Sequence, residues 1–200
     1  MKITCVIMAG GKSSRMKTLD EKTIIPILGK AMIDYVIEAA LGSNVDEVLV
    51  AISQFTPKTT EIIKKFNIKI VQTAGKGYHE DLRQVLETFN LEIVLTISGD
   101  LPLIKSEDIN RIIEFYKKSK KPSLSVMAPV EDLEKFEIKP SYVMEYEGQK
   151  LIPIGINMLD GRIEKNIWQE QALMIVNNPQ FLFNVNTESD LNIINKFLKN

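Results

Sequence analysis

The stretch Ile3–Met16 reads ITCVIMAGGKSSRM, an apolar run that passes directly into a loop with two glycines, a lysine and an arginine. The apolar and β-branched residues of Ile3–Met8 predict a buried strand, which the glycines end. Backbone N–H groups beside glycines can approach an anion closely, and Lys12 and Arg15 add positive charge there. The stretch therefore predicts the first strand of a sheet, followed either by a flexible turn or by a phosphate site.

Short strands alternate with helices along the rest of the chain. The predicted strands are 3–8, 47–52, 68–71, 92–97, 124–128, 173–176 and 181–185, and the predicted helices are 31–41, 78–89 and three segments capped by Thr56, Ser106 and Thr187. This alternation is typical of strand–helix–strand units and a mostly parallel sheet. We therefore predict an α/β fold of three layers, a central sheet with helices on both faces.

Residues 130–161 break this alternation. They contain several prolines and a predicted hairpin, in which 142–146 pairs with 151–152. We interpret the chain as a single domain over residues 1–200, with a small β-hairpin insertion at 130–161 that binds the acceptor substrate.

Composition excludes several classes of protein. The 200 residues are 44% hydrophobic and 26% charged, which is typical of a folded domain, and no apolar stretch is long enough to span a membrane. Lys and Arg number 25 against 26 for Asp and Glu, so no basic excess indicates nucleic acid as a partner. Cys5 is the only cysteine, which excludes an internal disulfide and a thiolate zinc cluster. We expect a cytoplasmic protein.

Four polar or glycine-rich loops follow the predicted strands. They are Ala9–Met16, Ser53-Gln54, Thr73–Gly77 and Ser98–Asp100. In an open parallel sheet, ligands bind at the carboxyl ends of the strands, so these loops are expected to meet at one cleft. The first loop matches neither the P-loop pattern nor the dinucleotide-binding G-x-G-x-x-G pattern. Asp100 is the best candidate for a metal ligand, with a turn or capping role as the alternative.

These motifs resemble those of known enzymes. AGGKSSRM followed by Lys22 resembles the signature AGGxxxRM…K of nucleotidyltransferases that act on sugar nucleotides and on the molybdenum cofactor. GKGYHEDL (75–82), SGDLPLIKS (98–106) and FNVNTESDL (183–191) narrow the resemblance to the archaeal-type GTP:adenosylcobinamide-phosphate guanylyltransferases of cobalamin synthesis. The resemblance covers nearly the whole chain, and it departs at Thr23, where the family signature usually has proline. It implies a Rossmann-like nucleotidyltransferase fold and transfer of GMP from GTP to adenosylcobinamide phosphate, with release of pyrophosphate.

The resemblance also implies a set of site residues. Arg15, Lys22 and Asp100 are expected to be catalytic: Arg15 neutralises the departing pyrophosphate, Lys22 reaches the α-phosphate, and Asp100 binds Mg²⁺. A second metal ligand is expected at Asn186, with Asn184 as the alternative. The residues expected to bind the nucleotide are Ala9, Gly10, Gly11, Lys12, Ser13, Ser53, Thr73, Gly75, Lys76 and Gly77.

Other functions stay open on the sequence. A molybdenum-cofactor guanylyltransferase shares AGGxSSRM and the late NVNT stretch, but that family typically has a GPLxG-like segment where this chain has AGKGYHEDL. A sugar-phosphate nucleotidyltransferase is usually longer, and a GTP-binding protein without turnover does not need both Lys22 and Asp100. His79 is expected to contact substrate or solvent, because a phosphate nucleophile is already ionised and needs no general base. GTP and a corrinoid phosphate are the expected substrates. The chain could form a homodimer, but no motif indicates the oligomeric state.

Overall fold

A computed structural model gives the fold of the chain. It describes residues 1–12, 21–136, 140, 142–163, 170–178, 181, 183, 185 and 188–197, apart from the side chains of 188, 189 and 195–197. The strands are β1 (Ile3–Met8), β2 (Pro26–Ile27), β3 (Lys30–Ala31), β4 (Glu47–Ser53), β5 (Lys69–Thr73), β6 (Ile93–Ser98), β7 (Ser123–Pro129), β8 (Met144–Tyr146), β9 (Gln149–Asp160) and β10 (Gln171–Ile175). The helices are α1 (Met32–Leu41), α2 (Pro57–Ile63), α3 (Tyr78–Thr88), α4 (Ser106–Ser119), α5 (Val130–Glu134) and α6 (Glu188–Phe197), with a short 3-10 turn at Lys22–Ile24.

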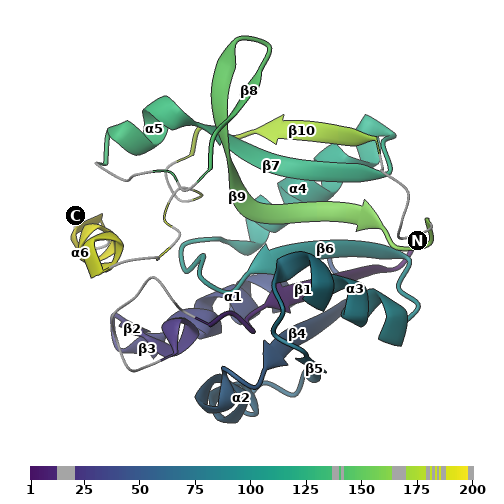
Figure 1. Ribbon diagram of the computed structural model, residues 1–200, viewed down its shortest axis with the longest axis vertical. Helices are drawn as coiled ribbons and strands as arrows, with labels where there is room; N and C mark the ends of the chain where they lie inside the picture. Colours follow the sequence, from purple (N-terminus) through teal and green to yellow (C-terminus); the bar gives the residue numbers. More distant parts are fainter. Residues whose placement is uncertain are drawn as a thin grey trace.

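One mixed sheet of eight strands forms the centre of the molecule (Figure 1). Its order is β10-β7-β9-β6-β1-β4-β5, and β8 pairs with β9. The strands β6, β1, β4 and β5 are parallel to one another, as are β10 and β7. Between these two groups β9 runs antiparallel to both of its neighbours, β6 and β7. The predicted mostly parallel sheet is confirmed, and the structure adds one antiparallel strand near its middle.

Helices cover both faces of the sheet. The larger core cluster packs the apolar sides of α1 and α4 against one face, with residues such as Val36 and Ile112 fully buried. The smaller cluster packs α3 against the other face through Leu82, Val85 and Leu86. Figure 1 shows α3 in front of the parallel strands and α4 behind β7 and β10. The three layers predicted from the alternation of strands and helices are therefore present.

The stretch 130–161 supplies α5, β8 and β9. The predicted hairpin is present as β8 and β9, which turn at Glu147 and Gly148 with positive φ angles of 48° and 77°. However, β9 continues through the centre of the sheet, so this part of the predicted insertion belongs to the main core. Its role in binding an acceptor stays a prediction.

Two local predictions are changed by the structure. Ser106 was expected to cap α4, but it is the first residue of that helix, and its hydroxyl donates to the Ala39 carbonyl of α1 (2.9 Å). A strand was expected at 181–185, of which Phe181, Phe183 and Val185 are described and lie in no strand. Instead Phe183 and Val185 are buried in a third cluster with residues of β2 and α1. This packing holds the chain around Phe183 and Val185 against β2 and the start of α1.

Candidate active site

A cavity of about 620 Å³ lies at the carboxyl ends of β1, β4, β5 and β6. The predicted residues that line it are Gly10, Gly11, Lys12, Gly75, Lys76 and Gly77. Gln54, Ala74 and Ser98 also line it and lie in loops that were predicted to meet at the cleft; the lining residues that the sequence analysis did not place there are Met8, Phe55, Tyr78 and Asp81. Because all four parallel strands contribute, the expected convergence of their loops on one cleft is present in the structure.

The two glycines after β1 differ in their surroundings. A side chain at Gly10 would bring its Cβ to 3.1 Å from the Ile52 backbone carbon, a tight contact, so glycine favours this close approach to β4. A Cβ at Gly11 would meet nothing within 4 Å, which leaves the backbone beside it open to the cavity. Lys12 follows, with its ammonium 4.6 Å from the centre of the Phe55 ring. The open, positively charged end of this loop can accept phosphate groups.

Three predicted binding residues are buried next to the cavity and are not among its lining residues. Ala9 is 2% exposed, and its N–H donates to the Ala51 carbonyl. The buried Ser53 hydroxyl donates to the Gly10 carbonyl (2.7 Å), and the buried Thr73 hydroxyl donates to the Ile52 carbonyl (2.8 Å). These contacts fix the loops after β1, β4 and β5 to one another; binding of the nucleotide by these three residues stays a prediction.

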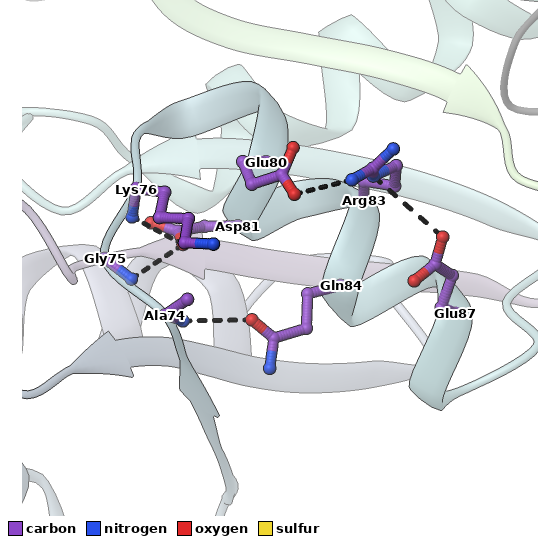
Figure 2. A network of polar contacts seen from close by, with 8 residues as sticks. All are labelled: Ala74, Gly75, Lys76, Glu80, Asp81, Arg83, Gln84 and Glu87. Carbon is purple, nitrogen blue, oxygen red and sulfur yellow. Dashed lines mark hydrogen bonds and ion pairs between the residues drawn. The ribbon is translucent and has the colours of Figure 1, made fainter.

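The loop after β5 is held by side chains of α3 (Figure 2). Asp81 Oδ1 accepts hydrogen bonds from the N–H groups of Gly75 (2.9 Å) and Lys76 (3.2 Å), and Gln84 Oε1 accepts from Ala74 N–H (2.9 Å). Gly75 has a φ of 67°, and a Cβ there would lie 2.7 Å from the Phe55 ring. Sequence reasoning found the glycines but missed Asp81, whose signal is an acid in the first turns of the helix after a glycine-rich loop.

Lys22 and Asp100 form an ion pair beside the cavity. Each side chain is 13% exposed, so the pair is largely removed from water. The Ser98 hydroxyl, at the cavity wall, donates to Asp100 Oδ1 (2.6 Å), and Gly99 N–H donates to the Met8 carbonyl (3.0 Å). These two contacts fix the loop after β6 next to the end of β1. Two predicted catalytic residues, 78 positions apart in the sequence, are thus brought together.

Glu21 anchors the segment that carries Lys22. Its carboxylate accepts from the N–H groups of Lys58 (2.6 Å) and Thr59 (2.7 Å), at the N-terminal end of α2. Thr56 is the N-cap residue of this helix and Pro57 its first residue, as predicted, but the Thr56 hydroxyl bonds to Ser53 and not to a helix N–H group. A carboxylate at a helix N-terminus also interacts favourably with the helix dipole. Sequence reasoning missed this anchor because Glu21 is far from α2 along the chain.

Four predicted site residues, Ser13, Arg15, Asn184 and Asn186, lie outside the described residues. Their roles stay predictions. Val185 is described, and its N–H donates to the Asp100 carbonyl (3.2 Å), so the backbone of the late segment reaches the loop after β6.

Tyr78 and His79 begin α3 and differ in their contacts. The Tyr78 hydroxyl bonds to the hydroxyl of Thr96 (2.8 Å) and accepts from the Asn157 amide (3.1 Å). Burial of this end of the ring raises the pKa of Tyr78, so the phenol stays protonated at neutral pH. His79 is exposed, stacks edge-on against the Tyr78 ring and does not line the cavity. The expectation that His79 contacts substrate stays a prediction.

The described part of the chain lacks two features. It contains no group of three or more His, Cys, Asp or Glu side chains that could hold a metal ion by themselves. No helix within it has the length and apolar character needed to cross a membrane.

Comparisons with known proteins agree with this geometry. Residues 5–139 match the model of the MobA-like NTP transferase domain. The adenosylcobinamide-phosphate guanylyltransferase of Methanocaldococcus jannaschii is 36% identical, over 97% of this chain and 96% of that protein. The bifunctional protein GlmU of Thermodesulfovibrio yellowstonii is 36% identical over 57% of this chain, which spans 25% of the GlmU protein.

Solved structures show the same fold at low sequence identity. A CMP:2-keto-3-deoxy-manno-octonic acid synthetase in complex with CTP has a TM-score of 0.71 and 17% identity, over 99% of this chain and 98% of that one. The 4-diphosphocytidyl-2C-methyl-D-erythritol synthase of Anaerococcus prevotii has a TM-score of 0.71 and 13% identity, over 100% of this chain and 96% of that one. The chain is a nucleotidyltransferase: it belongs to the MobA-like NTP transferase family and, within it, to the adenosylcobinamide-phosphate guanylyltransferases.

Proposed function

We propose that this enzyme transfers GMP from GTP to adenosylcobinamide phosphate and releases pyrophosphate. The observation that carries the proposal is the similarity over almost the full length of both chains to a guanylyltransferase of that name. The lysine, the aspartate and the glycine pair of the shared motifs lie in or beside one cavity, as a phosphate-transfer reaction requires.

The reaction needs positioning and charge more than covalent chemistry. A phosphate oxygen of the acceptor attacks the α-phosphorus of GTP, and the bond from this phosphorus to the pyrophosphate oxygen breaks. The nucleophile is already ionised at neutral pH, so no side chain has to remove a proton. The protein then accelerates the reaction by aligning the groups and by stabilising the charge that builds up on the phosphates.

The loop after β1 is the proposed phosphate site. The open backbone beside Gly11 offers N–H groups, and the Lys12 ammonium supplies charge at the same end of the cavity. Ser13 and Arg15 continue this loop in the sequence, and we assign them to the triphosphate with the same role.

Lys22 and Asp100 form the proposed catalytic pair. Lys22 contacts the α-phosphate as charge develops there, and the Asp100 carboxylate holds Mg²⁺. The donor set fits this ion, because Mg²⁺ prefers oxygen ligands and completes its shell with water and substrate phosphates. When bound, Mg²⁺ supplies positive charge that neutralises the phosphates. Asn186, or in its place Asn184, is proposed as a further oxygen ligand.

The acceptor is proposed to bind over the other half of the sheet, with contributions from 130–161. Among the described residues, no helix covers the α3 side of β7, β9 and β10 (Figure 1). The polar side chains of Ser125 and Asn157, joined by a hydrogen bond of 2.8 Å, lie on that side and continue to Tyr78 at the cavity wall. An acceptor phosphate placed there lies next to the nucleotide.

The choice of acceptor is tested by transfer of label. The protein is incubated with Mg²⁺ and GTP that carries ³²P at the α-position, together with adenosylcobinamide phosphate, molybdopterin or a sugar 1-phosphate. Label in the corrinoid product alone supports the proposal. Label in molybdopterin alone supports the second candidate, which the MobA-like domain favours, and label in no acceptor contradicts both. We also propose that the enzyme works in the cytoplasm; light scattering decides between a monomer and a homodimer.

A further inference from the structure

Guanine carries a feature that a binding site can select. Its N1–H and its 2-amino group are two hydrogen-bond donors that lie side by side on one edge of the base. Adenine has an acceptor at N1 and no amino group at position 2. A carboxylate accepts hydrogen bonds without donating any, and bonds to a charged acceptor are stronger than neutral ones. A buried carboxylate at the base-binding end of the cavity is therefore the chemistry that favours guanine over adenine.

Asp81 is the one carboxylate among the described residues that line the cavity. It is 6% exposed, and the N–H groups of Gly75 and Lys76 hold its Oδ1 atom in place (Figure 2). Two N–H donors on one oxygen fix the plane of the carboxylate, because rotation of the side chain would leave both donors without a partner. The position of the second oxygen is thereby fixed as well.

The second oxygen, Oδ2, is available to a ligand. It has no hydrogen bond to any residue that the structure describes. The buried oxygens without a partner in the described part of the chain are those of Asp34 and Asp132, so Asp81 Oδ2 is not sealed in the interior. Since Asp81 lines the cavity, we infer that this oxygen faces it.

Charge determines which end of the nucleotide meets Asp81. A triphosphate is strongly negative, and it is repelled by the Asp81 carboxylate, which forms no ion pair with any residue that the structure describes. Lysines line both ends of the cavity, Lys12 after β1 and Lys76 after β5. The β1 end adds the open backbone beside Gly11 and has no carboxylate among its described lining residues, so the phosphates are assigned to that end and the base to the loop after β5. There Phe55 and Gly77 line the cavity, and a Cβ at Gly77 would meet nothing within 4 Å, which leaves room for a flat base.

We propose that Asp81 selects guanine by accepting hydrogen bonds from its N1–H and its 2-amino group at Oδ2. The proposal rests on the function given above, since it takes GTP as the donor substrate. It adds the residue that determines base specificity, and it gives Asp81 two roles: Oδ1 positions the loop, and Oδ2 recognises the base.

The direct test is Asp81→Asn, with binding of GTP, ITP and ATP measured by calorimetry. In the variant, the N–H groups of Gly75 and Lys76 hold the amide oxygen, so the amide NH₂ faces the cavity. This donor opposes guanine N1–H and suits adenine N1. We expect GTP affinity to fall at least 30-fold, ATP affinity to stay the same or rise, and the GTP preference over ITP to disappear.

The matched control is Glu80→Gln, the same change from acid to amide one residue away. Glu80 pairs with Arg83 (2.5 Å) and does not line the cavity, so the order of affinities should not change (Figure 2). An equal fall for GTP, ITP and ATP in Asp81→Asn would overturn the proposal, since it would show a positioning role alone. An unchanged preference for GTP would overturn it too.

A second measurement needs no variant. ITP lacks the 2-amino group, and N1-methyl-GTP lacks the N1–H. The wild-type protein should bind each of them at least 10-fold more weakly than GTP, and equal affinities would contradict the proposal. If GTP itself does not bind, or label reaches no corrinoid, the proposed function fails. If GTP binds and reacts but the base preference does not depend on Asp81, only this inference fails.

Discussion

The two halves of the central sheet differ in how they are built. In the half formed by β5, β4, β1 and β6, all strands are parallel and each passes into a loop at the same edge. In the half formed by β9, β7 and β10, one strand is antiparallel and its register with β7 shifts between Ser125 and Met127. The regular half collects side chains from distant segments at one cavity. The irregular half presents one face without a described helix, which suits a large acceptor.

The largest expected effect concerns turnover in the regular half. Lys22→Ala should lower kcat by about 100- to 1000-fold, because charge that builds up on the α-phosphate loses its partner. GTP affinity should change no more than about threefold, since other contacts hold the ground state. Steady-state kinetics and calorimetry measure the two quantities. Lys64→Ala removes an exposed lysine paired with Glu61 and is the control. Equal losses in kcat and affinity would deny Lys22 this role.

Alanine substitutions at two glycines with positive φ, one in each half, compare how rigidly the two turns are packed. Gly75→Ala should lower the free energy of unfolding by about 2–3 kcal/mol, because φ is positive and the new Cβ collides with the Phe55 ring. Gly148→Ala, in the β8–β9 turn, has the same strain in φ but open space, so about 1 kcal/mol is expected. Urea denaturation measures both. Similar values for the two variants would mean that the loop after β5 can move away from Phe55.

The anchor at Glu21 links α2 to Lys22, the proposed catalytic lysine. Glu21→Ala should cost about 1–2 kcal/mol of stability, because two N–H groups at the start of α2 lose their acceptor. It should also lower kcat, since the backbone next to Lys22 is released. Glu61→Ala removes an exposed acid from the same helix and should do neither. A loss of stability with full turnover would show that Lys22 does not depend on this anchor.

The smallest expected effect is a loss of stability at alkaline pH that is due to Cys5 in the core strand β1. Burial raises the pKa of Cys5 from 9.0 to about 12. The unfolded chain then loses the thiol proton first, so stability falls as the pH rises above 9. At pH 10 the difference from pH 8 should be about 1.4 kcal/mol, and Cys5→Ala should lack this contribution. If the wild-type protein and Cys5→Ala lose stability equally between pH 8 and 10, the thiol is not buried as described.

The sequence predicted the regular half well because its signals are local. Apolar runs such as Ile3–Met8 and Ile93–Ser98 form strands from their own composition, and parallel topology then places the following loops together. The position of β9 could not be predicted, since hydrophobic periodicity does not say which strand pairs with which. The predicted hairpin is present, but its second strand also pairs with β6 and β7. These pairings join strands that are far apart in the sequence, so local patterns do not predict them.

Within the site, the sequence predicted which segments come together better than it predicted what each side chain contacts. Lys22 was expected to contact the α-phosphate and Asp100 to bind Mg²⁺; the structure brings the two together as an ion pair, and both roles stay predictions. Ser53 and Thr73 were expected to touch the nucleotide, which stays a prediction; in the structure their hydroxyls bond to the backbone carbonyls of Gly10 and Ile52. Asp81 was missed because its importance depends on the fold of the preceding loop. A hydroxyl or carboxylate near a motif can point to the ligand or bond to the backbone, and the packing of the surrounding loops determines which of the two it does.

The central claim is that the nucleotide spans the regular half from the β1 loop to the β5 loop. The most direct measurement is a crystal structure with Mg²⁺ and a GTP analogue whose α–β bridge is a methylene group. We expect the phosphates at the amides of Gly10 to Lys12, the metal on Asp100, and guanine at the loop held by Asp81. A nucleotide bound over β7 and β10, or one bound in this cavity with base and phosphates exchanged, would contradict it.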